Sequence, residues 1–282
     1  MIEVTAAGEL RAWRRAQRDQ GRRVGFVPTM GALHEGHLAL VDEARRQTDA
    51  VAMSIFVNPL QFGPGEDLAR YPRNLDRDRA LARARRVDLL FVPDAAAMYP
   101  PGAETRVVPG PAAERWEGAA RPGHFTGVLT VVAKLFHLVE PDLACFGQKD
   151  IQQVTLVRRM LDDLDWPLRL VVVPTVRETD GLALSSRNVY LSPAERNEAL
   201  GLNRALRAAE SAWRRGERSA ARLHELIVAE LALHPGLVPD YIAIVDPDTL
   251  VPVAAAVPGT VMALAATIGS TRLIDNVILE ER

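Results

Sequence analysis

The sequence contains one cysteine, no long apolar run and almost no net charge. Cys145 is the only cysteine among 282 residues, which excludes an intramolecular disulfide and indicates a reducing compartment. No stretch approaches the roughly 20 apolar residues that a membrane-spanning helix needs. The 34 basic and 36 acidic residues nearly cancel, so no overall field favours a polyanion. We therefore expect neither a membrane nor a nucleic acid as a partner.

The first residues predict a helix rather than a signal peptide. Residues 1–17, MIEVTAAGELRAWRRAQ, contain no apolar stretch of signal-peptide type and predict an amphipathic helix. Cys145 lies between Leu143 and Phe146 in an apolar run and is expected to be a buried core thiol rather than a nucleophile. These features predict a cytoplasmic protein.

Short apolar runs alternate with helical patterns through the first two-thirds of the chain. This rhythm is typical of an α/β fold, in which helices cover a doubly wound parallel sheet. Ligands bind beyond the carboxyl ends of such strands, so the loops after Val27, Phe56 and Phe146 are expected to face one cleft. The predicted strands are residues 24–27, 51–56, 89–92, 143–146 and 168–173, and the predicted helices are residues 36–46, 75–85, 128–138 and 151–164.

The pattern changes after about Val176. Two long helices are predicted there, over residues 193–215 and 219–233, and Ser192 is the expected N-cap of the first. The tail then alternates as strands do. We predict a catalytic domain over residues 1–176 and a smaller α+β domain over residues 177–282, with strands at 241–245, 261–265 and 273–277.

The first motif that suits chemistry is FVPTMGALHEGH, residues 26–37, at a strand-to-helix junction. Its two imidazoles, His34 and His37, fall on one side of the helix start. The free N–H groups and positive dipole end of a helix suit a phosphate, and Gly36 allows a nucleotide to approach the backbone. Imidazoles placed there can stabilise an α-phosphate as its charge grows. The alternative for this motif is a pair of surface histidines near a turn, which would have the same sequence. A metal site is disfavoured because no third His or Cys is in register.

A second motif, FGQKDIQQ, spans residues 146–153 at another strand-to-helix junction. Lys149, shortly after Gly147, is placed to contact phosphate oxygens. Asp150 would cap the helix or orient a ribose hydroxyl or a metal-bound water. A solvated loop with a capping Asp is the alternative for this string taken alone.

A third motif, LALSSRNVYLS, spans residues 182–192 just after the predicted domain boundary. Ser185 and Ser186 offer hydroxyl donors, and Arg187 offers a guanidinium that would neutralise leaving-group charge, so the strip suits a clamp on a triphosphate. Loops at domain junctions form lids of this kind. A polar linker between domains is the alternative.

Two further pairs of polar residues suit a small anionic substrate. Asn58 and Gln61 follow the second predicted strand, and their amides donate and accept hydrogen bonds without adding charge. Arg121 and His124 precede a strongly apolar helix, where they would either face an anionic ligand or cap the helix. The residues alone do not choose between those two roles.

Together these strings resemble the pantothenate synthetase family of the HxGH nucleotidyltransferase-like superfamily. The likeness runs essentially from end to end and includes RLIDN at residues 272–276. It implies a Rossmann-like catalytic domain, a C-terminal lid domain, a homodimer and the use of ATP with Mg2+. It also implies a ligase of pantothenate and coenzyme A biosynthesis: pantoate and ATP would give pantoyl adenylate and pyrophosphate, and β-alanine would then give pantothenate and AMP.

The resemblance implies roles for individual residues. His34 and His37 would contact the α-phosphate, with His37 as proton donor. The expected catalytic residues are His34, His37, Lys149, Ser185, Ser186 and Arg187. Gln61 would bind pantoate and β-alanine, and Gln153 would bind pantoate; Asn58, Arg121 and His124 complete the expected substrate set. The expected ATP contacts are Pro28, Thr29, Met30, His34, His37, Gly147, Lys149, Asp150, Val176, Leu184, Ser185, Ser186 and Arg187.

Two positions depart from the family's pattern. Gln148 replaces a common Glu in the second motif, which is tolerable because Lys149 and Asp150 remain. Arg77 stands where some members carry an acidic residue proposed to hold Mg2+. No protein metal ligand is therefore assigned, and the neighbouring Asp76 and Asp78 are only candidates.

Three other functions share parts of the pattern. A nucleotidyltransferase that joins AMP or CMP to a phosphorylated acceptor would share the histidine motif and the sheet, but the amides of Asn58 and Gln61 suit a carboxylate better. A fragment of a class I aminoacyl-tRNA synthetase would need an anticodon-binding extension and a basic surface, and neither is visible. A non-catalytic nucleotide-binding module would not need donors at an α-phosphate.

Overall fold

The computed structural model describes residues 1–281, and the chain divides into two compact units. Residues 111–120 and 148–155, which the sequence analysis places in the first domain, cluster with the second unit. The physical reason is that Trp116 and Ile151 pack on apolar side chains of the second unit's sheet. The first unit comprises residues 1–110, 121–147 and 156–174, and the second comprises residues 111–120, 148–155 and those from Thr175 onward.

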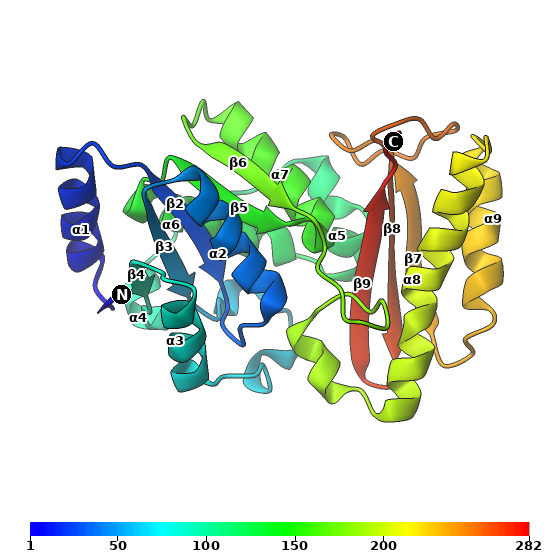
Figure 1. Cartoon of the computed structure of the whole chain (residues 1–282), viewed down its shortest axis with the longest axis horizontal. Coiled ribbons are helices and arrows are strands. Elements are labelled where there is room, and N and C mark those ends of the chain that lie inside the picture. The colour runs from blue at the N-terminus through cyan, green and yellow to red at the C-terminus, as the bar shows by residue number, and fades with distance from the viewer. Residues whose placement is uncertain (282) are drawn as a thin grey trace. The chain divides into compact units, whose positions relative to one another are not determined.

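Six parallel strands form the sheet of the first unit, in the order β1-β4-β3-β2-β5-β6 (Figure 1). The strands that follow β2 in the chain are added on one side as β3 and β4 and on the other as β5 and β6, so the order reverses at β2. Ligands bind beyond the carboxyl ends of the strands at such a reversal. The strands are β1 (Ile2–Val4), β2 (Val24–Thr29), β3 (Ala50–Ile55), β4 (Leu89–Phe91), β5 (Leu143–Gly147) and β6 (Arg169–Val173).

Helices connect these strands, as a doubly wound fold requires. Every residue of β3 is buried, because a parallel sheet is covered on both faces; this explains the continuous apolar runs in the sequence. The α-helices are α1 (Ala7–Asp19), α2 (Glu35–Gln47), α3 (Leu75–Ala84), α4 (Ala95–Met98), α6 (His124–Val139) and α7 (Ile151–Asp163), of which residues 151–155 belong to the second unit; the short 3-10 helices are η1 (Pro59–Gln61) and η2 (Asp67–Ala69).

The second unit is built on a three-stranded antiparallel sheet in the order β7-β8-β9. Its strands are β7 (Val238–Val245), β8 (Val261–Ile268) and β9 (Thr271–Ile278). Ser192 caps the longest helix with a hydrogen bond from the Glu195 amide, as predicted. The helices are η3 (Pro111–Glu114), α5 (Glu117–Ala120), η4 (Gln148–Asp150), η5 (Ser186–Tyr190), α8 (Pro193–Arg214) and α9 (Ala220–Leu231).

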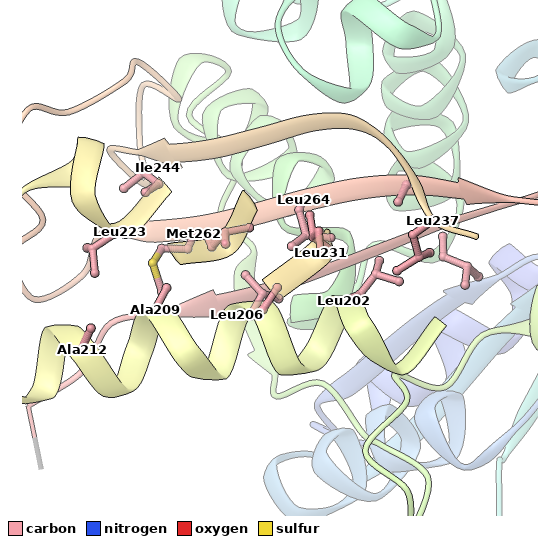
Figure 2. Close-up of a cluster of buried hydrophobic side chains, with 14 of the residues drawn as sticks. Leu202, Leu206, Ala209, Ala212, Leu223, Leu231, Leu237, Ile244, Met262 and Leu264 are labelled. Carbon is pink, nitrogen blue, oxygen red and sulfur yellow. The ribbon is translucent and has the colours of Figure 1, made fainter. Parts of the chain in front are cut away.

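Two layers cover the faces of this smaller sheet. Side chains alternate between the two faces along a strand, so Met262 and Leu264 of β8 pack with α8 and α9, whereas Val261 and Ala263 belong to a separate cluster that includes Trp116. Figure 2 shows the first cluster, to which α8 contributes Leu202, Leu206, Ala209 and Ala212 and α9 contributes Leu223 and Leu231. Each face of the sheet is therefore buried.

The predicted α/β class, with a parallel sheet and a smaller antiparallel sheet, is confirmed. The N-terminal prediction was incomplete, because Ile2–Val4 forms β1 beside β4 and the helix begins only at Ala7. Three residues are too few to show an alternation that distinguishes a strand from a helix start.

Candidate active site

The junction between β2 and α2 carries the two predicted histidines at a helix N-terminus. His34 is the N-cap of α2, and its Nδ1 accepts a hydrogen bond from the Gly36 amide at 3.1 Å. The His34 amide in turn donates to Nδ1 of His37 at 3.3 Å. The centroids of the two rings lie 4.1 Å apart, and the ring planes are tilted by 37°. Each histidine thus takes part in a reciprocal capping arrangement of the kind that Ser and Glu usually form.

This capping fixes where the imidazole protons lie. A ring nitrogen that accepts a backbone N–H carries no proton, so in the neutral ring the proton is on the other nitrogen. Nδ1 is the acceptor in both His34 and His37, which assigns the N–H to Nε2 in both rings. The helix start therefore holds two imidazole donors where a helix dipole already favours an anion.

The loop that leads into this helix is held by α3. Asp78 is 1 % exposed, and its two carboxylate oxygens accept hydrogen bonds from the amides of Ala32 and Leu33 at 2.9 and 2.8 Å. Arg77 donates to the Leu33 carbonyl at 2.8 Å. Gly31 has φ of 81°, and a Cβ there would lie 3.0 Å from Asp78. The carboxylate can approach the loop so closely only because residue 31 is a glycine.

A second polar group lies in η1, after β3. The Asn58 amide donates to Oε1 of Gln61 at 3.1 Å, and the Gln61 amide donates to the sulfur of Met30 at 3.1 Å. The Tyr99 hydroxyl donates to Oδ1 of Asn58 at 2.9 Å, and burial raises the pKa of Tyr99 to about 12, so the hydroxyl keeps its proton. These bonds orient both amides, and they turn the NH2 group of Gln61 toward Met30. Gln61 is thereby set as a donor for an anionic or hydroxyl group.

Arg121 and His124 form hydrogen bonds to the last residue of η1. His124 Nδ1 donates to the Gln61 carbonyl at 2.8 Å, and Arg121 donates to the same carbonyl at 3.3 Å and to His124 Nε2 at 3.1 Å. Arg121 also forms a two-pronged pair with Glu66 at 2.6 and 3.0 Å. Burial works against the Glu66 charge, but the Arg121 pair prevails and holds the Glu66 pKa below its ordinary value. Both residues therefore contact the Gln61 carbonyl, which favours support of Gln61 over direct capture of a substrate.

In the second unit, the turn that carries Lys149 and Asp150 is tied to β9. The buried amide of Asn276 donates to the carbonyls of Gln148 and Lys149, both at 2.9 Å. The Gln148 amide donates to Oδ1 of Asn276 at 3.1 Å. Lys149 is half-buried and makes no ion pair with any of residues 1–281. Its ammonium is thus available to an anion.

The third motif continues a short hairpin-like segment. The Leu184 amide donates to the Val176 carbonyl at 3.0 Å, and Ser185 caps η5 by accepting from the Arg187 amide at 3.2 Å. Asn188 donates to the Ala183 carbonyl at 3.1 Å. The strip that was predicted as a clamp or a linker therefore contains a short 3-10 helix, η5, in the second unit.

Comparison with known proteins identifies the family of this chain. A family model described as pantoate-beta-alanine ligase matches residues 3–278. The chain belongs to the pantoate–beta-alanine ligase family. A pantothenate synthetase of Heliobacterium modesticaldum is 54% identical over 277 residues, which are 98% of this chain and 99% of that protein.

Solved structures of the family resemble the whole chain. The pantothenate synthetase of Thermus thermophilus has a TM-score of 0.94 at 53% identity, with all of both chains covered. The pantoate-beta-alanine ligase of Francisella tularensis, complexed with beta-gamma ATP and beta-alanine, has a TM-score of 0.82 at 34% identity and covers 100% of this chain and 99% of that chain. The α/β architecture is therefore that of pantoate–beta-alanine ligases.

The expected ligase residues divide between the two units. In the first unit, His34 contacts His37, and Gln61 contacts Met30. Pro28 and Thr29 end β2, and the Thr29 hydroxyl donates to the Ser54 carbonyl at 2.7 Å. Gly147 ends β5 in the first unit. The second unit carries Lys149, Asp150, Gln153, Val176, Leu184, Ser185, Ser186 and Arg187.

The carboxylates near Arg77 are not arranged as metal ligands. Both oxygens of Asp78 accept backbone N–H groups, and the side chain of Asp76 is 93% exposed and pairs with Arg79. Within residues 1–281 no cluster of three or more His, Cys, Asp and Glu side chains is placed to hold a metal ion.

Several supporting residues escaped the sequence analysis. Tyr99, Glu66 and Asn276 carry no motif by themselves, and their partners lie 41, 55 and 128 positions away in sequence. Asp78 was considered only as a possible metal ligand. The RLIDN strip drew attention to Asn276, but that strip did not predict which residues Asn276 contacts.

The remaining expectations concern Cys145 and the membrane. Cys145 is buried, and burial raises its pKa to about 12, which makes it a core thiol rather than a thiolate nucleophile. Among the described residues, no helix combines the length and the apolar character needed to cross a bilayer.

Proposed function

We propose that this protein condenses (R)-pantoate with β-alanine in a reaction driven by ATP, with pantoyl adenylate as the intermediate and AMP and pyrophosphate as the other products. Family membership over residues 3–278 supports the overall reaction. The observation that carries the mechanism is the pair of Nε2 donors at the N-terminus of α2. A carboxylate is a poor electrophile until one of its oxygens becomes a good leaving group, and adenylation supplies that change.

His34 and His37 would act on the α-phosphate. Attack by the pantoate carboxylate builds negative charge on the phosphate oxygens before pyrophosphate departs, and donors that are already oriented stabilise that charge without reorganising. His37 would donate a hydrogen bond through its Nε2–H as the charge develops. Backbone hydrogen bonds orient both rings.

The other residues would bind and orient the substrates. Gln61 would donate to pantoate and later to β-alanine through its oriented amide, with Asn58, Arg121 and His124 holding it. Gln153 would bind pantoate. Lys149, Ser185, Ser186 and Arg187 would bind the triphosphate and neutralise the leaving pyrophosphate. Pro28, Thr29, Met30, Gly147, Asp150, Val176 and Leu184 would complete the nucleotide contacts.

We further propose that Mg2+ arrives with ATP. Magnesium is usually bound through substrate phosphates and one or two carboxylates, and Asp78 is committed to two backbone amides. We therefore assign the ion no protein ligand. We also propose a homodimer in the cytoplasm, which the family resemblance supports, and the single thiol is compatible with a reducing compartment.

Exchange of labelled pyrophosphate into ATP tests the proposal. Adenylation is reversible, so exchange should occur with pantoate when β-alanine is absent, and β-alanine alone should give none. Exchange supported by a phosphorylated acceptor but not by pantoate would mean that the nucleotidyltransferase alternative is correct. Exchange that requires β-alanine would mean a concerted reaction without a free adenylate.

A further inference from the structure

Two adjacent polar residues of β9, Asp275 and Asn276, are almost completely buried. They are 3% and 1% exposed. Buried polar groups of this kind are found where they have specific partners, because an unpaired one costs free energy. Neighbouring residues of a strand point to opposite faces of the sheet. Asp275 and Asn276 therefore serve different partners, and both partners belong to segments that carry predicted ATP-binding residues.

Asn276 reaches the η4 turn. Its NH2 group donates to the carbonyls of Gln148 and Lys149, and its carbonyl accepts from the Gln148 side chain. The Asn276 amide thus uses both of its N–H donors and its oxygen on two consecutive residues. The backbone from which the Lys149 side chain extends is thereby fixed to the strand.

Asp275 reaches the segment that precedes Ser185. Its carboxylate forms a two-pronged pair with Arg177 at 2.6 and 2.9 Å. Arg177 also donates to the Gly181 carbonyl at 3.2 Å and is paired by a backbone bridge with Ala183. The ion pair therefore closes the hairpin-like segment whose second arm leads into Leu184–Arg187.

We propose that Asp275 and Asn276 are positioning residues that hold the Lys149 turn and the Ser185–Arg187 segment in a fixed spatial relation for binding ATP. All of these residues lie in the second unit, and the inference rests on the proposed function. Two adjacent residues of β9 then fix the positions of both phosphate-binding segments. A shift of either segment misplaces charged groups that act only at short range.

The departure at position 148 fits this arrangement. The Gln148 NH2 group faces the Asn276 carbonyl, whereas a glutamate there would turn a carboxylate oxygen toward that acceptor. The same reasoning makes Asn276→Asp a sharp probe. It keeps the size of the side chain but puts an acceptor oxygen against two backbone carbonyls.

The test measures KM for ATP, KM for pantoate and kcat by pantoate-dependent pyrophosphate exchange, with the thermal midpoint recorded for each variant. Asn276→Asp and Asp275→Asn should raise KM for ATP by about tenfold or more and leave KM for pantoate close to the wild-type value. Arg177→Lys keeps the charge but loses the two-pronged geometry, and it should give the same split if Asp275→Asn does not fold.

Asp240→Asn provides a matched control. Asp240 also pairs with an arginine on β9, Arg272, at 2.5 Å. Among the described residues its side chain bonds to Arg272 and Thr267, and neither belongs to an ATP-binding segment. This variant should leave both KM values unchanged.

The outcomes separate the two claims. A rise in KM for ATP alone supports the positioning role. Folded variants that keep the wild-type KM for ATP overturn the positioning role. Variants whose kcat falls only in proportion to their folded fraction, with KM for ATP unchanged, overturn it as well. Wild-type protein that shows no pantoate-dependent exchange overturns the proposed function itself, and the positioning role for ATP with it.

Discussion

At the scale of single residues, the central feature is that two histidines form the cap of a helix. His34 accepts the Gly36 amide, and His37 accepts the His34 amide. In each ring, Nδ1 thus has the structural role of capping the helix, and Nε2 has the chemical role of donating a hydrogen bond. Substitutions can separate them, because other residue types cap helices without supplying an imidazole donor.

His34→Ala should lower the adenylation rate by on the order of 10²-fold or more, with a much smaller effect on ATP binding. It should also destabilise the protein by about 1 kcal/mol, because the N-cap is lost. His34→Asn restores a capping oxygen and should recover the thermal midpoint but not the rate. Single-turnover adenylation and thermal unfolding check this, and near-normal turnover in both variants would refute the assignment.

Cys145 should be inert in the folded protein. Burial raises its pKa to about 12, so almost no thiolate exists at about pH 8, where alkylating reagents attack exposed thiols. Iodoacetamide should therefore leave the native protein unlabelled and fully active, and it should label the denatured protein once. Mass spectrometry checks the label, and activity loss that parallels labelling of the native protein would contradict the assignment of Cys145 as an inert core thiol.

At the scale of elements, the β2–α2 loop owes its shape to a helix far away in sequence. Asp78 of α3 accepts two amides of the loop, with sequence separations of 46 and 45 residues. Hydrogen bonds to a charged group contribute about 1.5 to 3 kcal/mol each when buried. The loop and the histidines that follow it therefore depend on α3.

Asp78→Asn should slow adenylation by about tenfold or more, because a displaced loop misplaces both imidazoles. The asparagine keeps one acceptor oxygen but turns an NH2 group toward a second N–H, so the thermal midpoint should also fall. Asp76→Asn is the matched control on the same helix: its side chain is 93% exposed and should be nearly neutral. Steady-state and single-turnover rates of both variants check this. Equal loss in the two variants would instead favour a metal-binding role for these carboxylates.

Local sequence patterns predicted the elements well but not their contacts. The strands at β2, β3 and β5 follow from apolar runs, and α8 follows from Ser192, Pro193 and helical periodicity. The bonds of Asp78, Tyr99 and Asn276 join residues 41 to 128 positions apart, and no local pattern encodes such a pairing. The placement of residues 111–120 and 148–155 with the second unit escaped prediction for the same reason.

At the scale of the whole molecule, the expected ligase residues are shared between two compact units. The histidines and Gln61 belong to the first, and Lys149 and Arg187 belong to the second. If the proposed roles are correct, substitutions in the second unit should affect the step that handles the triphosphate more than the step that does not.

Lys149→Ala should therefore lose most adenylation activity, by on the order of 10²-fold, yet still convert supplied pantoyl adenylate and β-alanine to pantothenate. The reason is that pyrophosphate has already left when β-alanine attacks. Arg222→Ala is a control, because Arg222 is an exposed residue of the same unit that pairs with Glu225. Separate assays of the two half-reactions check this, and equal damage to both would point to a role at the acyl centre.

Pantoate labelled with ¹⁸O in its carboxylate tests the central claim most directly. If the carboxylate attacks the α-phosphate, one labelled oxygen stays on that phosphorus when β-alanine displaces the nucleotide. Mass spectrometry of the products should then find one ¹⁸O in AMP and none in pyrophosphate. Label in pyrophosphate or in inorganic phosphate, or AMP without label, would contradict an acyl adenylate and the role assigned to His34 and His37.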